Sequence, residues 1–467
     1  MLGGRINEVT GDTEGAPSVW RAPGMPALLG STALGFAGFA LLMPVAPLWV
    51  LDGGADELGA GVVNGVLMLC TVLAQLFVGR ALRRLGWRWT LTLGACLLGA
   101  PTPVHLLTDE VWAVTLLAAV RGLGFGIITV CGATGVAALV EPARRGRAVG
   151  AYGLAVAAPQ FLLVPVAPWF AERIGFWLVF ALAAVPLLAA PLAVPVAHAL
   201  RAERPSAGPE LRGSGRVSAE SAESGESGES GESGDRTVGE ASAESPGPAR
   251  PTEPGRPVER RDAAALRRAL AGPIVALLAI TSAGGAVLTF TPSLDPDPTT
   301  VYVALVVFTG TAALCRWGIG GYADRRGAAP AIAPLLFVGA AGLAAIAVAT
   351  VSGHRPAGRF LLVAGMLAVG VAYGGLQNLT LVQSFAAAGE HARSTVSTAW
   401  NVGFDAGTGL GALAAGAVAT STSYTASYAV LAVTTALVGL GWAGSRWRAK
   451  RGAGRLPADS PRESSGR

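Results

Sequence analysis

Long uncharged apolar runs alternate with short polar stretches along most of the chain. Each run approaches or exceeds the ~20 residues that an α-helix needs to cross a ~30 Å hydrocarbon layer. In chain order the runs are Ala22–Leu51, Leu58–Gly79, Trp89–Thr108, Val111–Val140, Ala148–Ala171, Ile174–Leu200, Ala269–Leu294, Val301–Gly321, Ala331–Val351, Phe360–Gly389, Ser394–Thr420 and Tyr424–Ala443. Only helices use such runs in lipid, because every backbone polar group must be paired within the segment. The pattern predicts an all-α membrane protein with twelve transmembrane helices.

Polar segments divide these twelve predicted helices into two groups of six. The expected parts are a polar tail (1–24), a six-helix bundle (25–200), a hydrophilic linker (201–268), a second six-helix bundle (269–444) and a second tail (445–467). The linker contains Ser-Gly-Glu repeats and then a Pro-rich stretch, which cannot bury enough apolar surface to fold. We therefore predict a disordered tether, while serine next to glutamate also fits a phosphorylated regulatory segment.

Composition and charge agree with a membrane protein. The chain is 52% hydrophobic and only 14% charged, which is too apolar for a soluble protein of 467 residues. Basic residues gather in the loops after the second, fourth, eighth and twelfth runs, so these loops and both termini are expected on the cytoplasmic side of the cell membrane. The first run is too long for the core of a signal peptide and is read as a retained helix.

Several classes of function lack their sequence signals. The net charge of +5 comes from the membrane-flanking loops, and there is no basic soluble surface for nucleic acid. The four cysteines lie inside predicted helices without metal-ligand spacing. With no nucleotide loop and no nucleophile beside a base, we expect neither an enzyme nor a bound metal or cofactor.

One loop occurs twice, each time after the second run of a six-run group. Residues 320–327 read Gly-Gly-Tyr-Ala-Asp-Arg-Arg-Gly, and residues 79–86 read Gly-Arg-Ala-Leu-Arg-Arg-Leu-Gly. Glycines at both ends allow tight turns and close helix approach. The repetition predicts a duplicated bundle.

On these residues the chain resembles the major facilitator superfamily over essentially its whole ordered length. The signature loop of that family reads Gly-x-Leu-Ala-Asp-Arg-x-Gly. The matching residues are Gly320, Asp324, Arg325 and Gly327 in the second copy and Gly79, Arg84 and Gly86 in the first, where Arg83 replaces the acid. The resemblance implies two pseudo-symmetric six-helix bundles that rock about a central site and carry a small-molecule substrate. We expect the protein to work as a monomer in the lipid bilayer.

The repeated loop is predicted to gate this movement. Pseudo-symmetry places Asp324 against the positive N-terminal end of the fifth helix, near Ala148. The equivalent Arg83 would be repelled by such an end, so we expect it to pair with Glu390. The alternative is that these residues only set membrane topology.

Asp405 is the one carboxylate deep within a predicted span. Placing it there costs ~2.5–3.5 kcal/mol on insertion scales, which makes function the default hypothesis. Asn401, Asp405 and Thr408 share a helix face, and Gly403, Gly407 and Gly411 form a neighbouring small-residue face suited to close packing. Asp405 is either a proton-coupling group or a structural hydrogen-bonding carboxylate.

Arg121 is the other charge in the middle of a span. The resemblance implies a role in proton transfer, since efflux members of the family carry an arginine in the fourth helix. This chain lacks the glutamine that follows in their motif. The competing interpretation is an anchor that binds backbone carbonyls.

The family resemblance also implies that the first, fourth, seventh and tenth helices line the central cavity. The cavity candidates are then Tyr373, Gln377, Thr380, Asn401, Phe36, Phe39 and Thr281. Each of them is equally compatible with packing or hydrogen bonds between helices.

The sequence therefore predicts a secondary active transporter that exports small amphipathic or hydrophobic compounds in exchange for protons. Proton-coupled uptake of a metabolite is the main alternative. A transporter-like sensor or scaffold that signals through the linker is a remote one.

Overall fold

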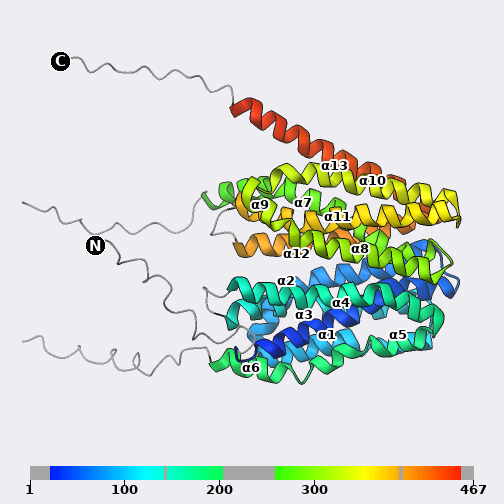
Figure 1. The fold of residues 1–467 in the computed structure, drawn as a ribbon. Helices are drawn as coiled ribbons and strands as arrows, with labels where there is room; N and C mark the ends of the chain where they lie inside the picture. Colours follow the sequence, from blue (N-terminus) through cyan, green and yellow to red (C-terminus); the bar gives the residue numbers. More distant parts are fainter. Residues whose placement is uncertain (1–21, 141–144, 203–257, 389–392, 454–467) are drawn as a thin grey trace, which may run out of the picture. The chain divides into compact units, whose positions relative to one another are not determined.

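The computed structural model describes residues 22–140, 145–202, 258–388 and 393–453, and the regular structure there is helical (Figure 1). The N-terminal half contains α1 (Met25–Asp52), α2 (Glu57–Gly99), η2 (Pro103–Leu107), α3 (Val111–Leu139), α4 (Arg145–Arg173), α5 (Phe176–Leu182), η4 (Val185–Ala189) and α6 (Ala193–Ala202). The C-terminal half contains α7 (Val258–Phe290), η6 (Thr291–Ser293), α8 (Pro298–Gly318), α9 (Gly320–Arg326), α10 (Ala329–Ser352), α11 (Pro356–Ala388), α12 (Arg393–Ser421) and α13 (Tyr424–Ala453). The all-α prediction is confirmed.

Eleven segments of the described chain are long and apolar enough to cross a membrane. One of them, Glu57–Leu107, has 51 residues, more than twice the ~20 that one crossing needs. It contains the second and third predicted runs, which α2 joins across a break at Gly86. Eleven segments thus accommodate all twelve predicted runs.

The two copies of the repeated loop turn in the same way. Gly86 has φ 75° and ψ 173°, and Gly327, seven residues after Gly320 as Gly86 is after Gly79, has φ 75° and ψ 160°. Positive φ favours glycine because a Cβ atom would clash with the backbone. The internal repeat therefore extends to backbone conformation, and we call this end of the helices the repeat-loop side.

The second span of each half also begins in the same way, on the side opposite the repeat loops. Asp56 caps α2 by accepting a hydrogen bond from the Gly59 amide at 2.8 Å. Asp297 caps α8 by accepting from the Thr299 amide at 3.1 Å and from the Thr300 hydroxyl at 2.8 Å. The Thr300 hydroxyl and the Thr299 amide stabilise the carboxylate and lower the pKa of Asp297.

Proline interrupts the sixth predicted run, which was expected as one helix over Ile174–Leu200. Pro186 lies in the 3-10 turn η4, and Pro191 precedes α6. Proline lacks a backbone N–H and clashes with the preceding turn, so it breaks the α-helix there. The run becomes α5, η4 and α6.

The seventh helix begins earlier than its apolar run. α7 starts at Val258, whereas the run starts at Ala269. The intervening residues include alanine, leucine and arginine, which favour helix, but the charged residues among them interrupt the apolar run. The rest of the predicted linker, together with Glu390 and most of both tails, lies outside the described residues.

Glycines bring α12 close to helices of both halves. Cβ atoms added at Gly403, Gly407 and Gly411 would meet α7 at Ile274, Thr281 and Ser282 respectively. Those added at Gly409 and Gly416 would meet α2 at Met68 and Glu57. The predicted small-residue face is confirmed, and Figure 1 shows α12 next to α2. Both halves belong to one unit by their backbone contacts.

Candidate functional site

Asp405 forms a hydrogen bond between the two halves. The Gln75 Nε2 atom on α2 donates to Asp405 Oδ2 on α12 at 2.7 Å. Asp405 lies twelve residues after the start of α12, about 18 Å along the helix axis, and its side chain is buried. Sequence analysis singled out Asp405 but assigned no decisive role to Gln75.

The N-terminal half adds neutral polar groups beside Gln75. The Gln75 amide also donates to the Thr129 hydroxyl of α3 at 3.5 Å. The Tyr152 hydroxyl of α4 donates to the Thr129 carbonyl at 3.3 Å. A chain of hydrogen bonds from three helices of this half therefore ends at Asp405.

Arg316 of α8 contributes a second charge from the C-terminal half. Its Nη1 donates to Gln377 Oε1 on α11 at 2.8 Å, and Asn378 Nδ2 donates to its backbone carbonyl at 2.9 Å. The charge of Arg316 acts on the phenol groups of Tyr152 and Tyr373, which come from opposite halves. Tyr373 also interacts electrostatically with Asp405.

These contacts define a central cluster. Its members are Gln75, Thr129, Tyr152, Arg316, Tyr373, Gln377 and Asp405. The predicted candidates Tyr373, Gln377 and Asp405 are thereby brought together. Sequence analysis did not name Arg316 as a site residue.

A row of aromatic rings runs beside the charged members of the cluster. Tyr373 lies 5.3 Å from Phe308 of α8 and 6.2 Å from Phe404 of α12, measured between ring centroids. Trp400 stacks on Phe404 at 5.6 Å. The row gives the cluster an apolar border that spans three helices of the C-terminal half.

Arg121 is placed apart from this cluster. Its side chain is fully buried in α3, and Nη2 donates to the Gly38 carbonyl of α1 at 3.3 Å. Nε and Nη1 have no hydrogen-bond partner among the described residues. This contact agrees with the carbonyl-anchor interpretation.

Phe36 and Phe39 of α1 pack away from the cluster as well. Both rings lie against Phe125 of α3, with centroid distances of 5.1 Å and 4.1 Å. All three side chains are buried. The structure assigns these phenylalanines to the core of the N-terminal half.

The other cavity candidates make hydrogen bonds within or between neighbouring helices. Thr281 donates to the Leu277 carbonyl on its own helix at 2.9 Å. Thr380 accepts from Trp400 Nε1 at 3.1 Å, which links α11 to α12. Asn401 is exposed and donates to the Ser397 carbonyl at 2.9 Å.

The residues of the repeat loops are mostly exposed. Gly79, Arg83, Arg84, Asp324 and Arg325 are exposed, while Gly320 is half-buried. The predicted contact of Arg83 with Glu390 falls outside the described residues. The gating hypothesis for Asp324 and Arg83 therefore stays a prediction.

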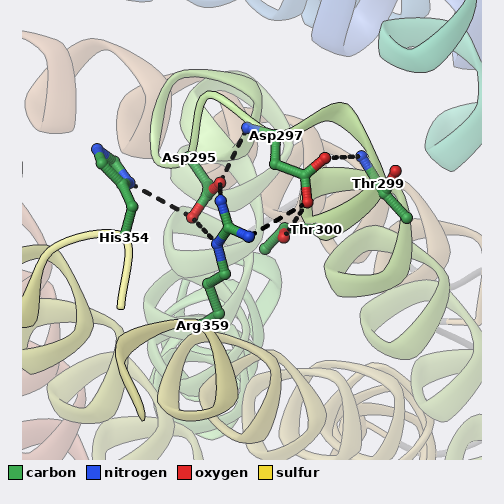
Figure 2. A network of polar contacts seen from close by, with 6 residues as sticks. All are labelled: Asp295, Asp297, Thr299, Thr300, His354 and Arg359. Atoms are coloured by element: carbon green, nitrogen blue, oxygen red, sulfur yellow. Dashed lines mark hydrogen bonds and ion pairs between the residues drawn. The ribbon is translucent and has the colours of Figure 1, made fainter. Parts of the chain in front are cut away.

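On the side opposite the repeat loops, a separate ionic network ties two connections of the C-terminal half together (Figure 2). Arg359 donates to both carboxylate oxygens of Asp295 at 3.1 Å, and its Nη1 lies 3.5 Å from Asp297 Oδ2. His354 Nδ1 is 3.4 Å from Asp295 Oδ2. The adjoining cavity of about 20 Å³ holds no more than a water molecule, so this network is structural.

Further contacts join the halves on this same side. Asn64 Nδ2 of α2 donates to the Thr289 hydroxyl of α7 at 2.9 Å. The Leu58 amide donates to the Thr420 hydroxyl of α12 at 2.8 Å. These hydrogen bonds and the close contacts of Gly409 and Gly416 hold α2 against the C-terminal half, in the region from Asp405 to the end of α12.

Long apolar helices in two halves, with a polar cluster between them, define a multi-pass membrane protein. The family model described as Major Facilitator Superfamily matches residues 28–412. The chain belongs to this superfamily.

Solved structures with the same fold include two transporters. The nucleoside transporter NupG has a TM-score of 0.61 at 13% identity, with 90% of this chain and 98% of that chain covered. The peptide transporter POT in complex with sulfate has a TM-score of 0.65 at 15% identity, with 92% and 95% covered. At such identities the likeness shows the fold alone. No curated protein matches the sequence.

Proposed function

We propose that this protein is a proton-coupled secondary transporter that works by alternating access, with Asp405 as the proton-binding group. The observation that carries the proposal is the Gln75–Asp405 hydrogen bond, which joins the halves at a buried carboxylate. An ionised carboxylate only accepts hydrogen bonds, whereas a protonated one also donates. Proton binding at Asp405 therefore changes the contact through which the halves meet.

The burial of Asp405 supports this coupling in energetic terms. An isolated charge at bilayer depth is costly, and neutralisation by a proton removes most of that cost. The Gln75 amide stabilises the ionised form with one strong hydrogen bond. Protonation weakens that bond and lets α2 and α12 separate, while the glycine contacts between α12 and α7 keep the C-terminal half together.

The first candidate function is export of small amphipathic or hydrophobic compounds from the cytoplasm. The protein would lie in the cell membrane as a monomer with both termini in the cytoplasm. The aromatic row beside Tyr373 supplies apolar surface for such substrates. Repeat-loop residues Asp324 and Arg83 would then limit opening toward the cytoplasm.

Proton-coupled uptake of a small polar metabolite is the second candidate. The observation that favours it is the number of amide and charged groups in the cluster, namely Gln75, Arg316, Gln377 and Asp405. Polar substrates need such partners because buried polar groups are costly without hydrogen bonds. Transport measured in vesicles of known orientation separates the two directions.

The test is proton movement in vesicles that contain the purified protein and a pH-sensitive dye. We expect a subset of a broad compound panel to trigger proton flux with the wild-type protein and none with Asp405→Asn. Asp52→Asn, an exposed aspartate at the end of α1, is the matched control and should behave as wild type. Undiminished proton flux with Asp405→Asn would exclude the coupling role.

The sensor alternative has its own test. Deletion of residues 212–257 within the linker should leave proton flux intact in a transporter. A signalling protein that uses the linker would lose its output.

A further inference from the structure

Arg316 presents a positive charge that the described protein does not neutralise. Among the described residues its side chain donates to the neutral Gln377 oxygen at 2.8 Å, and the ion pairs there all involve Asp295 or Asp297 instead. A guanidinium has five N–H donors in a fixed plane. Several donors of Arg316 therefore remain for another acceptor.

The Arg316 side chain is also accessible, unlike that of Arg121, the arginine within a span of the N-terminal half. Arg316 is exposed, although α4, α8 and α11 all supply residues around it, whereas Arg121 is fully buried against a carbonyl. The Arg316 backbone carbonyl accepts from Asn378, and its guanidinium donates to Gln377, so α11 holds it at two points. A charge that is fixed, reachable and unneutralised is arranged to bind an anion.

We propose that the transported substrate is an organic anion whose carboxylate, sulfonate or phosphate binds Arg316. This inference rests on the proposed transport function and names the substrate class of the same cluster. Arg316 offers planar paired donors that match such groups in a bidentate arrangement. The phenol groups of Tyr152 and Tyr373, one from each half, interact electrostatically with the same guanidinium.

The aromatic row indicates the rest of the substrate. Tyr373 interacts electrostatically with both Arg316 and Asp405, so the row passes near both charges. From there it continues through Phe404 to Trp400. A planar apolar body packs against these rings while its acidic group remains at Arg316. The expected substrates are amphipathic acids.

An alternative use of the charge is an ion pair between Arg316 and Asp405 in another conformation of the transport cycle. In that case Arg316 would affect proton flux and would not distinguish charged from neutral ligands. The experiment below separates these two roles.

The experiment measures binding to the purified full-length protein in nanodiscs by tryptophan fluorescence. The probes are naphthalene-2-carboxylate and naphthalene-2-carboxamide, which share one ring system and differ in charge. We expect at least a tenfold lower Kd for the carboxylate with the wild-type protein. Arg316→Gln should abolish this preference without changing the Kd of the amide, and Arg316→Lys should retain part of it.

Two further variants make the result specific. Arg448→Gln removes an exposed arginine at the end of α13 and should keep the full preference. Asp405→Asn removes a negative charge from the same cluster and should not weaken the preference for the carboxylate, so the anion site is tested separately from proton coupling, which the dye assay measures. Equal binding of both probes to the wild-type protein, or an unchanged preference in Arg316→Gln, would overturn the proposal. So would a loss of proton flux in Arg316→Gln without any loss of preference.

Discussion

The N-terminal and C-terminal halves share a fold but place an arginine within a membrane span in different surroundings. Arg121 in the N-terminal half is buried and donates to the Gly38 carbonyl. The Phe36, Phe39 and Phe125 rings pack between the same two helices, α1 and α3. Arg316 in the C-terminal half is exposed and adjoins a cluster built from both halves. The comparison shows that an arginine within a span can stabilise the core or form part of a polar site. The residues around it determine which role it has.

The halves differ in the same way in their other polar groups at this level. The C-terminal half supplies the charged members of the cluster, Arg316 and Asp405. The N-terminal half supplies neutral partners, Gln75, Thr129 and Tyr152. One half therefore holds the charges of the cluster, and in the proposed transport cycle movement of the other half would make or break hydrogen bonds to them.

The largest expected effect comes from locking the halves together. A Cβ atom built on Gly65 of α2 would lie 3.5 Å from the Leu413 Cβ of α12, within the range of disulfides. We expect Gly65→Cys with Leu413→Cys, in a background without the four native cysteines, to lose pH-driven transport on oxidation and regain it on reduction. The halves cannot separate while the bond is present.

The single-cysteine variants are the controls for this cross-link. Each should transport equally well before and after oxidation. Full transport by the quantitatively cross-linked protein would mean that α2 and α12 need not part.

The next effect concerns the hydrogen bond between the halves. Gln75→Leu leaves Asp405 without its partner, a loss worth ~1–3 kcal/mol, so we expect roughly tenfold slower proton-coupled transport. Initial rates in vesicles measure it. Gln160→Leu on α4 is the matched control because the Gln160 amide donates only to a carbonyl of its own helix, that of Val156. Equal rates for both variants would show that the Gln75 contact has no role in coupling.

A smaller effect is expected at Arg121. Arg121→Met replaces a buried guanidinium that has two unpartnered nitrogens with an apolar side chain of similar length. Such replacements of buried charged groups are often neutral or stabilising by about 1–4 kcal/mol. Thermal unfolding should show an unchanged or higher midpoint, and transport should persist. A properly folded Arg121→Met protein without proton flux would restore Arg121 as a coupling residue.

The smallest effect is the pH dependence of the α8 cap. Hydrogen bonds from Thr300 and Thr299 lower the pKa of Asp297, so its contribution to stability is complete above the ordinary aspartate pKa of about 3.9. That contribution disappears as the pH falls through the lowered pKa of the folded state. Melting of wild type and Asp297→Asn should therefore differ near neutral pH and converge in acid. A difference that is independent of pH would contradict this assignment.

Much of the fold follows from the sequence because its signals are local. Apolar length predicts the spans, and the repeated glycines predict the matching turns at Gly86 and Gly327. The break in the sixth span had a signal as well, since prolines at 186, 191 and 195 are unfavourable in a helix interior. Hydropathy alone does not reveal that these prolines interrupt the helix.

The site was less predictable because its contacts join distant parts of the chain. Asp405 stands out as a carboxylate in an apolar run, but Gln75 lies 330 residues away along the chain. Helical periodicity places residues on one face without showing which helix that face meets. For the same reason Phe36 and Phe39 were expected in a cavity and instead pack against Phe125.

The most direct test of the account measures two modes of transport in the same Asp405→Asn vesicles. With a substrate identified in the proton-flux panel, one assay follows uptake driven by a pH gradient, and the other follows exchange of labelled for unlabelled substrate without a gradient. We predict that gradient-driven uptake disappears while exchange continues, because the halves still move and only the proton-binding group is lost. Gradient-driven uptake at the wild-type level in Asp405→Asn would contradict the central claim.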